Sequence, residues 1–219
     1  MTGARAPVLH GYWRSGTSYR TRIALNLKGI AFDQVTHDLR TGEQPAPEYL
    51  ALNPQGLVPA LDLGGTVLTQ STAVLEWLEE RHPSPPLLPG SPEDRARVRA
   101  MALLIACDVH PLNNVRVLSY LRAEFGADEA SVSGWTSRWI TDGFIALEEL
   151  VARHGDGFCY GAKPTLADCH LVPQVYSAER FGVDLSPYPA IRAANARMLE
   201  LPQVAAAHPD QQPDSGASS

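Results

Sequence analysis

The chain has 219 residues and a formal net charge of −6 at pH 7, with 44% hydrophobic and 19% charged residues. This balance is typical of a globular protein, and the length fits one large domain or two small ones. The acidic balance argues against a nucleic-acid partner, because phosphate backbones attract Lys and Arg. The longest apolar run, residues 100–107, is far shorter than the roughly 20 residues that span a membrane, so we expect a cytoplasmic protein.

The first part of the chain alternates strand and helix patterns. In chain order we expect a strand at 8–13, a polar turn at 14–18, a helix at 19–28, a strand at 32–38, a loop with a short helix at 43–52, a hairpin of 57–63 and 66–69, and a helix from 71 to about 82. Gly64-Gly65 is the hairpin signal. A hairpin that follows a strand–helix–strand unit predicts a mixed sheet.

A proline-rich stretch divides the chain, with five prolines in residues 82–92. After it the pattern is helical, with helical stretches expected at 93–125, interrupted only at Pro111, and at 128–153, 165–181 and 189–200. Thr165 and Asp168 resemble a capping box at the start of the third of these helices. We therefore predict an α/β domain at 7–84, a linker at 85–92, an all-helical domain at 93–208 and a disordered tail at 209–219.

The polar turn between the first strand and the first helix is a candidate binding site. Helix N-termini carry unpaired N–H groups and a partial positive charge, so they favour a phosphate, a carboxylate or a thiolate. Ser15 and Thr17 add hydroxyl groups and Arg14 adds a positive charge. No cysteine lies in the turn, so a reacting thiolate would have to come from a ligand. An ordinary helix cap is the alternative interpretation.

Other polar residues are candidates with equally open alternatives. Ser71, after Gln70, is a natural N-cap that would also hold a carboxylate. Val58 precedes a proline, and a cis peptide there would turn its backbone outward. His110 and Asn114 are four residues apart, so we expect them on one face of a long helix, where a solvated face is the alternative. Arg180, near the end of a later predicted helix, is a further candidate, for which the alternative is that its charge complements the helix dipole.

The three cysteines and the arginine excess carry less information. Cys107, Cys159 and Cys169 suggest no disulfide framework, and Cys107-x-x-His110 lacks the second ligand pair of a metal site, so we expect no metal. Of the 18 basic residues only Lys28 and Lys163 are lysines. Genome composition explains this, and so does the binding of carboxylates by bidentate arginine.

Taken together, the motifs show that the chain resembles cytosolic glutathione transferases of the zeta class and is similar to bacterial maleylpyruvate and maleylacetoacetate isomerases. The resemblance rests on RSGTSYRTRIALNLKGI, ALNPQGLVPALD, QSTAVLEWLEE, CDVHPLNN, PTLADCHLVPQV and ERFGVDLSPYP, in that order over about residues 8–202. Many zeta enzymes carry Cys where this chain has Thr17, and often Gln where it has His110. Both departures favour the branch that resembles maleylpyruvate isomerase.

The resemblance implies a thioredoxin-like N-terminal domain, an all-α C-terminal domain, a homodimer, a cis Val58-Pro59 bond and a glutathione cofactor. Ser15, Gly16 and their neighbours would hold the sulfur, and Val58 would pair with the cysteinyl backbone. The remaining glutathione contacts that the resemblance implies are Gln55 at the glycyl end, Gln70 and Ser71 at the γ-glutamyl end, and Pro59, His110 and Asn114.

The chemistry that this site implies is cis–trans isomerisation of a maleyl-type diketo acid to its fumaryl isomer. A thiolate that adds to the double bond leaves a single bond that rotates, and its elimination regenerates the thiol. The expected catalytic residues are Arg14, Ser15, Thr17 and His110, and the expected carboxylate ligands are Arg14, Arg116 and Arg180. The alternatives are a general glutathione transferase or peroxidase, an isomerase of another unsaturated metabolite, and a non-catalytic binding protein.

Overall fold

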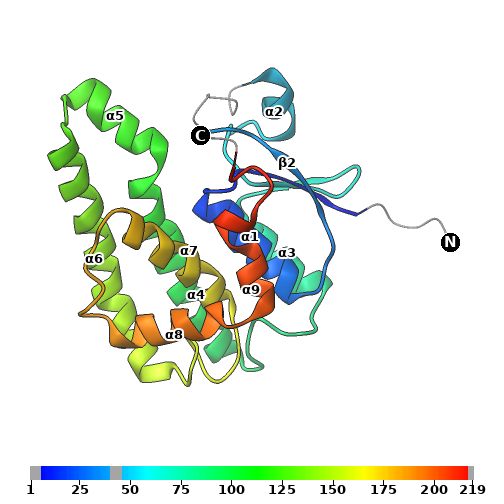
Figure 1. Ribbon diagram of the computed structural model, residues 1–219. Coiled ribbons are helices and arrows are strands. Elements are labelled where there is room, and N and C mark those ends of the chain that lie inside the picture. Colours follow the sequence, from blue (N-terminus) through cyan, green and yellow to red (C-terminus); the bar gives the residue numbers. More distant parts are fainter. Residues whose placement is uncertain (1–5, 40–45, 217–219) are drawn as a thin grey trace. The chain divides into compact units, whose positions relative to one another are not determined.

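The computed structural model describes residues 6–39 and 46–216, which form two compact units. The first unit holds the chain up to Pro86 together with the residues from Leu201 on, and the second holds Leu87–Glu200. Figure 1 labels the α-helices of both units and strand β2.

A four-stranded mixed sheet forms the centre of the first unit, in the order β2-β1-β3-β4. Its strands are β1 (Val8–Gly11), β2 (Asp33–Thr36), β3 (Ala60–Asp62) and β4 (Val67–Thr69). The pairs β1–β3 and β3–β4 are antiparallel, whereas β1 and β2 are parallel. The mixed sheet predicted from the hairpin is therefore confirmed.

Helices of this unit pack on the sheet and on one another. They are α1 (Gly16–Leu27), α2 (Pro47–Leu52), α3 (Ser71–Arg81) and α9 (Pro202–Ala207). Tyr49 of α2 packs with Tyr12 and Ala60, on the face of the sheet to which His10 also points. Leu9 and Leu61 pair between β1 and β3 and, by strand alternation, point to the opposite face. Of the predicted segment 43–52, residues 43–45 lie outside the described ranges.

The second unit is helical. Its elements are α4 (Pro92–Leu103), a π-helix (Leu104–Val109), a 3₁₀ helix (His110–Asn113), α5 (Val115–Phe125), α6 (Glu129–His154), α7 (Leu166–Arg180) and α8 (Pro189–Leu199). The predicted capping box begins α7, because the Asp168 carboxylate accepts the Thr165 N–H at 2.8 Å. Ile105, Phe144 and Leu171 are fully buried in its core.

The helical stretch expected at 93–125, with Pro111 as its one interruption, is divided into several elements in the structure. Pro111 has no N–H to donate, and the chain passes through π and 3₁₀ turns before Asn114 adopts an extended backbone (φ −70°, ψ 145°) and caps α5. His110 and Asn114 therefore do not share one face of a helix.

The expectation for the C-terminal end also needs correction. Residues 201–208 were assigned to the helical domain, but α9 packs on α1 in the first unit. The prediction of a disordered tail is wrong for residues 209–216, where Pro209–Gln211 form a 3₁₀ helix and Gln212 is buried. Residues 217–219 lie outside the described ranges.

Candidate active site

The polar turn is built by the end of β1 and the start of α1. The Ser15 N–H donates to the Tyr12 carbonyl at 3.0 Å, which turns the chain after the strand. Ser15 is the N-cap of α1, and its hydroxyl accepts the Ser18 N–H at 3.3 Å. Gly16 and Thr17, predicted as turn, are thus the first residues of the helix. Their N–H groups belong to the first turn of a helix, which has no intrahelical acceptors.

Hydroxyl groups link this turn to the loop before β3. The Thr17 hydroxyl donates to the Val58 carbonyl at 2.9 Å, and the Ser15 and Thr17 oxygens lie 2.9 Å apart. Thr17 has a single hydroxyl proton, which it donates to the Val58 carbonyl. Ser15 is therefore the donor in the hydrogen bond between the two hydroxyls. The Ser15 proton is therefore held by another hydroxyl rather than by a strong carbonyl acceptor.

The loop before β3 is fixed by α2. Val58-Pro59 is cis, as the resemblance implied. The preceding carbonyl, that of Leu57, accepts from the Tyr49 hydroxyl at 2.7 Å and from the Asn53 amide at 2.5 Å. Burial raises the pKa of Tyr49 to about 12, which keeps it a donor over the whole physiological pH range. This network places the Val58 peptide beside the Ser15 turn.

The junction of β4 and α3 carries the second polar group. Gln70 has φ 65° and is the one residue other than glycine with a positive φ in the described ranges. Such a backbone is costly for a residue with a side chain, and it often marks a functional site. Its side-chain amide donates to the Gln55 amide oxygen at 2.6 Å, so these two candidates do meet.

Ser71 is placed differently from the sequence prediction. Gln70 is the N-cap of α3, and Ser71 is the first residue of the helix. The Ser71 side chain is buried, and its hydroxyl accepts from the Arg20 guanidinium at 3.4 Å. The Ser71 N–H still lies in the open first turn of a helix, where a carboxylate would be favoured.

The second unit holds the remaining candidates. His110 is half-buried in the 3₁₀ helix, and the Asn114 side chain accepts the Arg116 N–H at 3.2 Å as it caps α5. The Arg116 side chain is exposed. Arg180, in the last turn of α7, is exposed and lies 5.8 Å from the Tyr176 ring and 5.7 Å from the Phe181 ring. In the first unit, Arg14 lies 5.3 Å from the Trp13 ring.

The first unit contains no cysteine, because all three cysteines belong to the second. Cys107 is exposed, whereas Cys159 and Cys169 are buried. Burial raises the pKa of the Cys159 thiol well above its usual value, so it is not a nucleophile. Within the described ranges, no group of three or more His, Cys, Asp or Glu residues is arranged to bind a metal, and no helix has the length and apolar content to span a membrane.

Several residues around the turn were missed by sequence reasoning. Arg20 and Arg22 are buried in α1, Tyr49 and Asn53 orient the Leu57 carbonyl, and the Asp214 carboxylate accepts the Trp13 N–H at 3.0 Å. The two arginines lie within the motif RSGTSYRTRIALNLKGI, but a buried arginine cannot be told from an exposed one by its type. Asp214 offers no local signal, because its partner is 201 positions away.

Comparison with known proteins identifies the family. The family model "Glutathione S-transferase, N-terminal domain" matches residues 14–81. A maleylpyruvate isomerase from a Ralstonia species is 53% identical over 210 residues, covering 94% of this chain and 99% of that protein. The holo structure of a maleylpyruvate isomerase, described as a bacterial zeta-class glutathione S-transferase, is also 53% identical, with a TM-score of 0.94 over 95% of this chain and 100% of that one.

A third relative extends the comparison to a second substrate. The maleylacetoacetate isomerase from Methylobacterium extorquens, solved with bound malonate and glutathione, is 40% identical, with a TM-score of 0.91 over 94% of this chain and 98% of that one. The chain belongs to the zeta class of the glutathione transferase family. The resemblance inferred from the sequence motifs and the fold that it implied are therefore confirmed.

Proposed function

We propose that the protein is a glutathione-dependent isomerase that converts a maleyl-type diketo acid, maleylpyruvate or maleylacetoacetate, to its fumaryl isomer. The observation that carries the proposal is the Ser15–Thr17–Val58 hydrogen-bond chain at the start of α1. It offers donors for a sulfur anion in a unit that has no cysteine. The isomerases named above, one of them with bound glutathione and a dicarboxylate, support the same function.

The donor set of the first unit fits glutathione. When bound, glutathione supplies a thiolate that adds reversibly to the double bond and allows rotation. Ser15 is the hydroxyl that turns its proton toward the sulfur, because this breaks only its bond to Thr17 and leaves the bond between Thr17 and Val58 intact. The N–H groups of Gly16 and Thr17 add to the same positive end of α1.

The other ends of glutathione are assigned by the same reasoning. Val58, whose carbonyl accepts from the Thr17 hydroxyl, offers its peptide group to the cysteinyl backbone, and Pro59, joined to Val58 by the cis peptide bond, is assigned to the same contact. Gln70 and Ser71 hold the γ-glutamyl carboxylate, and Gln55, bonded to Gln70, approaches the glycyl end.

The substrate's carboxylates are assigned to arginines. Arg14, Arg116 and Arg180 each carry a guanidinium that binds a carboxylate in bidentate fashion. His110 and Asn114 are assigned to the neighbourhood of the sulfur, where a donor would stabilise negative charge that develops on the substrate oxygen. Since the second unit contributes most of these residues, we assign it substrate recognition.

The direct experiment is an ultraviolet assay of both maleyl substrates, with and without added glutathione. We expect turnover of at least one substrate only when glutathione is present, and the faster substrate identifies the physiological class. Glutathione binding without turnover of either would reject these substrates and leave an isomerase of another unsaturated acid or a binding protein. The homodimer and the cytoplasmic location stay predictions. A measurement of the molar mass in solution tests the homodimer.

A further inference from the structure

The C-terminal segment of residues 209–216 lies against the turn that precedes α1. After α9 the chain returns to the start of α1, as the red segment of Figure 1 shows, and the Asp214 carboxylate accepts the Trp13 N–H at 3.0 Å. Trp13 directly precedes Arg14 and Ser15. A side chain from the far end of the sequence is thus bonded to the backbone of the proposed thiol site.

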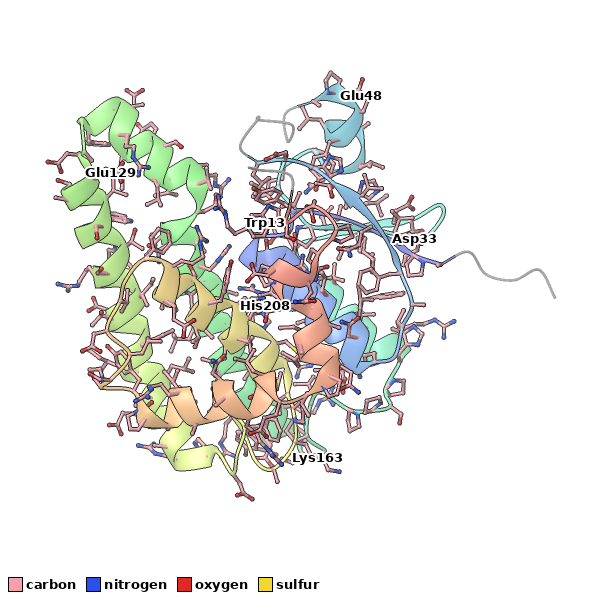
Figure 2. All side chains as sticks on the ribbon, viewed as in Figure 1. Trp13, Asp33, Glu48, Glu129, Lys163 and His208 are labelled. Atoms are coloured by element: carbon pink, nitrogen blue, oxygen red, sulfur yellow. The ribbon has the colours of Figure 1, made fainter. Side chains whose placement is uncertain are left out.

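Both peptide groups of Trp13 are held by side chains from outside the turn. Its carbonyl accepts from the Arg22 guanidinium at 2.9 Å, and the same guanidinium donates to the Ala207 carbonyl at 3.0 Å. Arg22 is 1% exposed, so these bonds form away from water. Figure 2 labels Trp13 before α1 and His208 after α9, which mark the two segments that Arg22 joins.

Hydrogen bonds of Gln212 hold the segment that carries Asp214. The buried Gln212 side chain donates to the Ala206 carbonyl at 3.0 Å and to the His208 carbonyl at 2.8 Å. Its amide oxygen accepts from the Gln34 side chain, at the edge strand β2, at 3.1 Å. Asp214 therefore lies two residues after the buried and hydrogen-bonded Gln212, which limits where its carboxylate can move.

We infer that Asp214 is a positioning residue for the thiol site. By holding the Trp13 N–H, it fixes the direction in which the chain enters the Arg14–Ser15 turn, and so the direction of the Ser15 hydroxyl. A hydrogen bond to a carboxylate is about twice as strong as a neutral one, and small displacements of a positioned donor are costly in catalysis. The inference rests on the proposed function for the meaning of the Ser15 hydroxyl, but the bond itself does not.

The test compares Asp214→Ala with Asp214→Asn, which retains an acceptor oxygen, and with Asp210→Ala as a matched control. Asp210 lies in the same segment, and its exposed carboxylate is 3.7 Å from His208. The readouts are the KM for glutathione and the pH dependence of the thiolate absorbance of bound glutathione. We expect Asp214→Ala to raise the KM about tenfold and to shift thiolate formation to higher pH, Asp214→Asn to recover most of the loss, and Asp210→Ala to change neither.

A second variant separates positioning from general folding. A chain that ends at Pro213 keeps Gln212 and its side-chain hydrogen bonds but lacks Asp214, and we expect it to behave as Asp214→Ala does. Unchanged KM and thiolate titration in both variants would overturn the inference.

A structural measurement keeps the inference separate from the proposed function. Amide exchange of the Trp13 N–H in the ligand-free protein should be faster in Asp214→Ala and unchanged in Asp210→Ala. If the wild-type protein neither binds glutathione nor isomerises the substrates, the proposed function fails, and this exchange still decides whether Asp214 holds the turn. Equal exchange in all three proteins would overturn the positioning role.

Discussion

At the scale of single residues, the proposed site depends on which hydroxyl proton is available. Thr17 gives its proton to the Val58 carbonyl, and Ser15 gives its own to Thr17. A new acceptor would therefore recruit Ser15 at a smaller cost than Thr17. The two hydroxyls thus have separate roles, Ser15 toward the sulfur and Thr17 toward the Val58 peptide.

This division predicts different kinetic effects for the two hydroxyls. Ser15→Ala should lower kcat about a hundredfold and raise the pKa of the bound thiol, because a donor to developing negative charge is lost. Thr17→Val should mainly raise the KM for glutathione, by about tenfold, since it frees the Val58 carbonyl. Thr17→Ser retains the hydroxyl and is the control. Equal effects of Ser15→Ala and Thr17→Val on kcat would contradict the division.

Arg180 is the residue-scale test of carboxylate recognition. Arg180→Ala should lower kcat/KM for a diacid substrate by about 10- to 100-fold, the cost of a hydrogen-bonded charge pair, and leave glutathione binding unchanged. Arg197→Ala is the matched control, because that exposed side chain pairs with Glu200 at 2.7 Å in the same unit. If Arg180→Ala has the kinetics of the wild type, Arg180 only complements the α7 dipole.

At the scale of elements, a buried ion pair joins the ends of α1 and α3. The Lys28 ammonium lies 2.5 Å from the Glu79 carboxylate and donates to the Pro85 carbonyl at 2.7 Å. The Lys28 and Glu79 side chains are 0% and 5% exposed. The pair therefore ties α1 to α3 and to the proline-rich stretch after it.

Removing one charge of the Lys28–Glu79 pair should lower the free energy of unfolding more than removing both charges. Lys28→Met leaves the Glu79 charge buried and should lower the free energy of unfolding by about 3–5 kcal/mol, whereas Lys28→Met with Glu79→Leu should recover much of it. Urea unfolding of the three proteins measures this. A double variant less stable than Lys28→Met would contradict the account.

Two histidines link β1 to the end of β2. The His10 Nδ1 and His37 Nε2 atoms are 3.0 Å apart, and the His37 ring lies 4.2 Å from the Tyr49 ring. Burial lowers the pKa of His10 from 6.5, with Asp62 acting in the opposite sense. The unfolded chain therefore binds a proton at His10 more readily than the folded protein does.

The sign of the pH effect follows from linkage. Stability from neutral His10 is complete above pH 6.5 and is lost as the pH falls through the lowered pKa of the folded protein. The urea midpoint should fall between pH 7.5 and 5.5, and it should fall less in His10→Asn, which does not titrate. An equal fall in the two proteins would rule out His10 as the source.

The elements also show what local patterns can reveal. The strand–turn–helix unit, the hairpin and the Thr165–Asp168 capping box follow from neighbouring residues, and each was predicted. Pro111 was the one sequence signal of the break after Val109, and the extent of the break was not predicted because the apolar spacing continues on both sides of Pro111. The described C-terminal segment was missed because its polar, proline-containing sequence is typical of disorder.

At the scale of the whole molecule, the candidate residues are divided between the two units. The hydroxyl chain and the Gln55–Gln70 contact join sequence-predicted residues of the first unit. The assignment of His110, Asn114, Arg116 and Arg180 to the same reaction rests on residue chemistry and on the family. The bonds of Asp214 and Arg22 span most of the chain, so no local pattern in the sequence reports them.

The central claim is that glutathione is a cofactor and is not consumed. The most direct test is an assay with glutathione at about one hundredth of the substrate concentration. Isomerisation is followed by ultraviolet absorbance, and the free-thiol concentration is measured before and after the reaction. We predict complete conversion of the substrate with the free thiol unchanged. Conversion that stops after one equivalent of glutathione, with a matching loss of free thiol, would contradict the account and indicate a transferase or peroxidase.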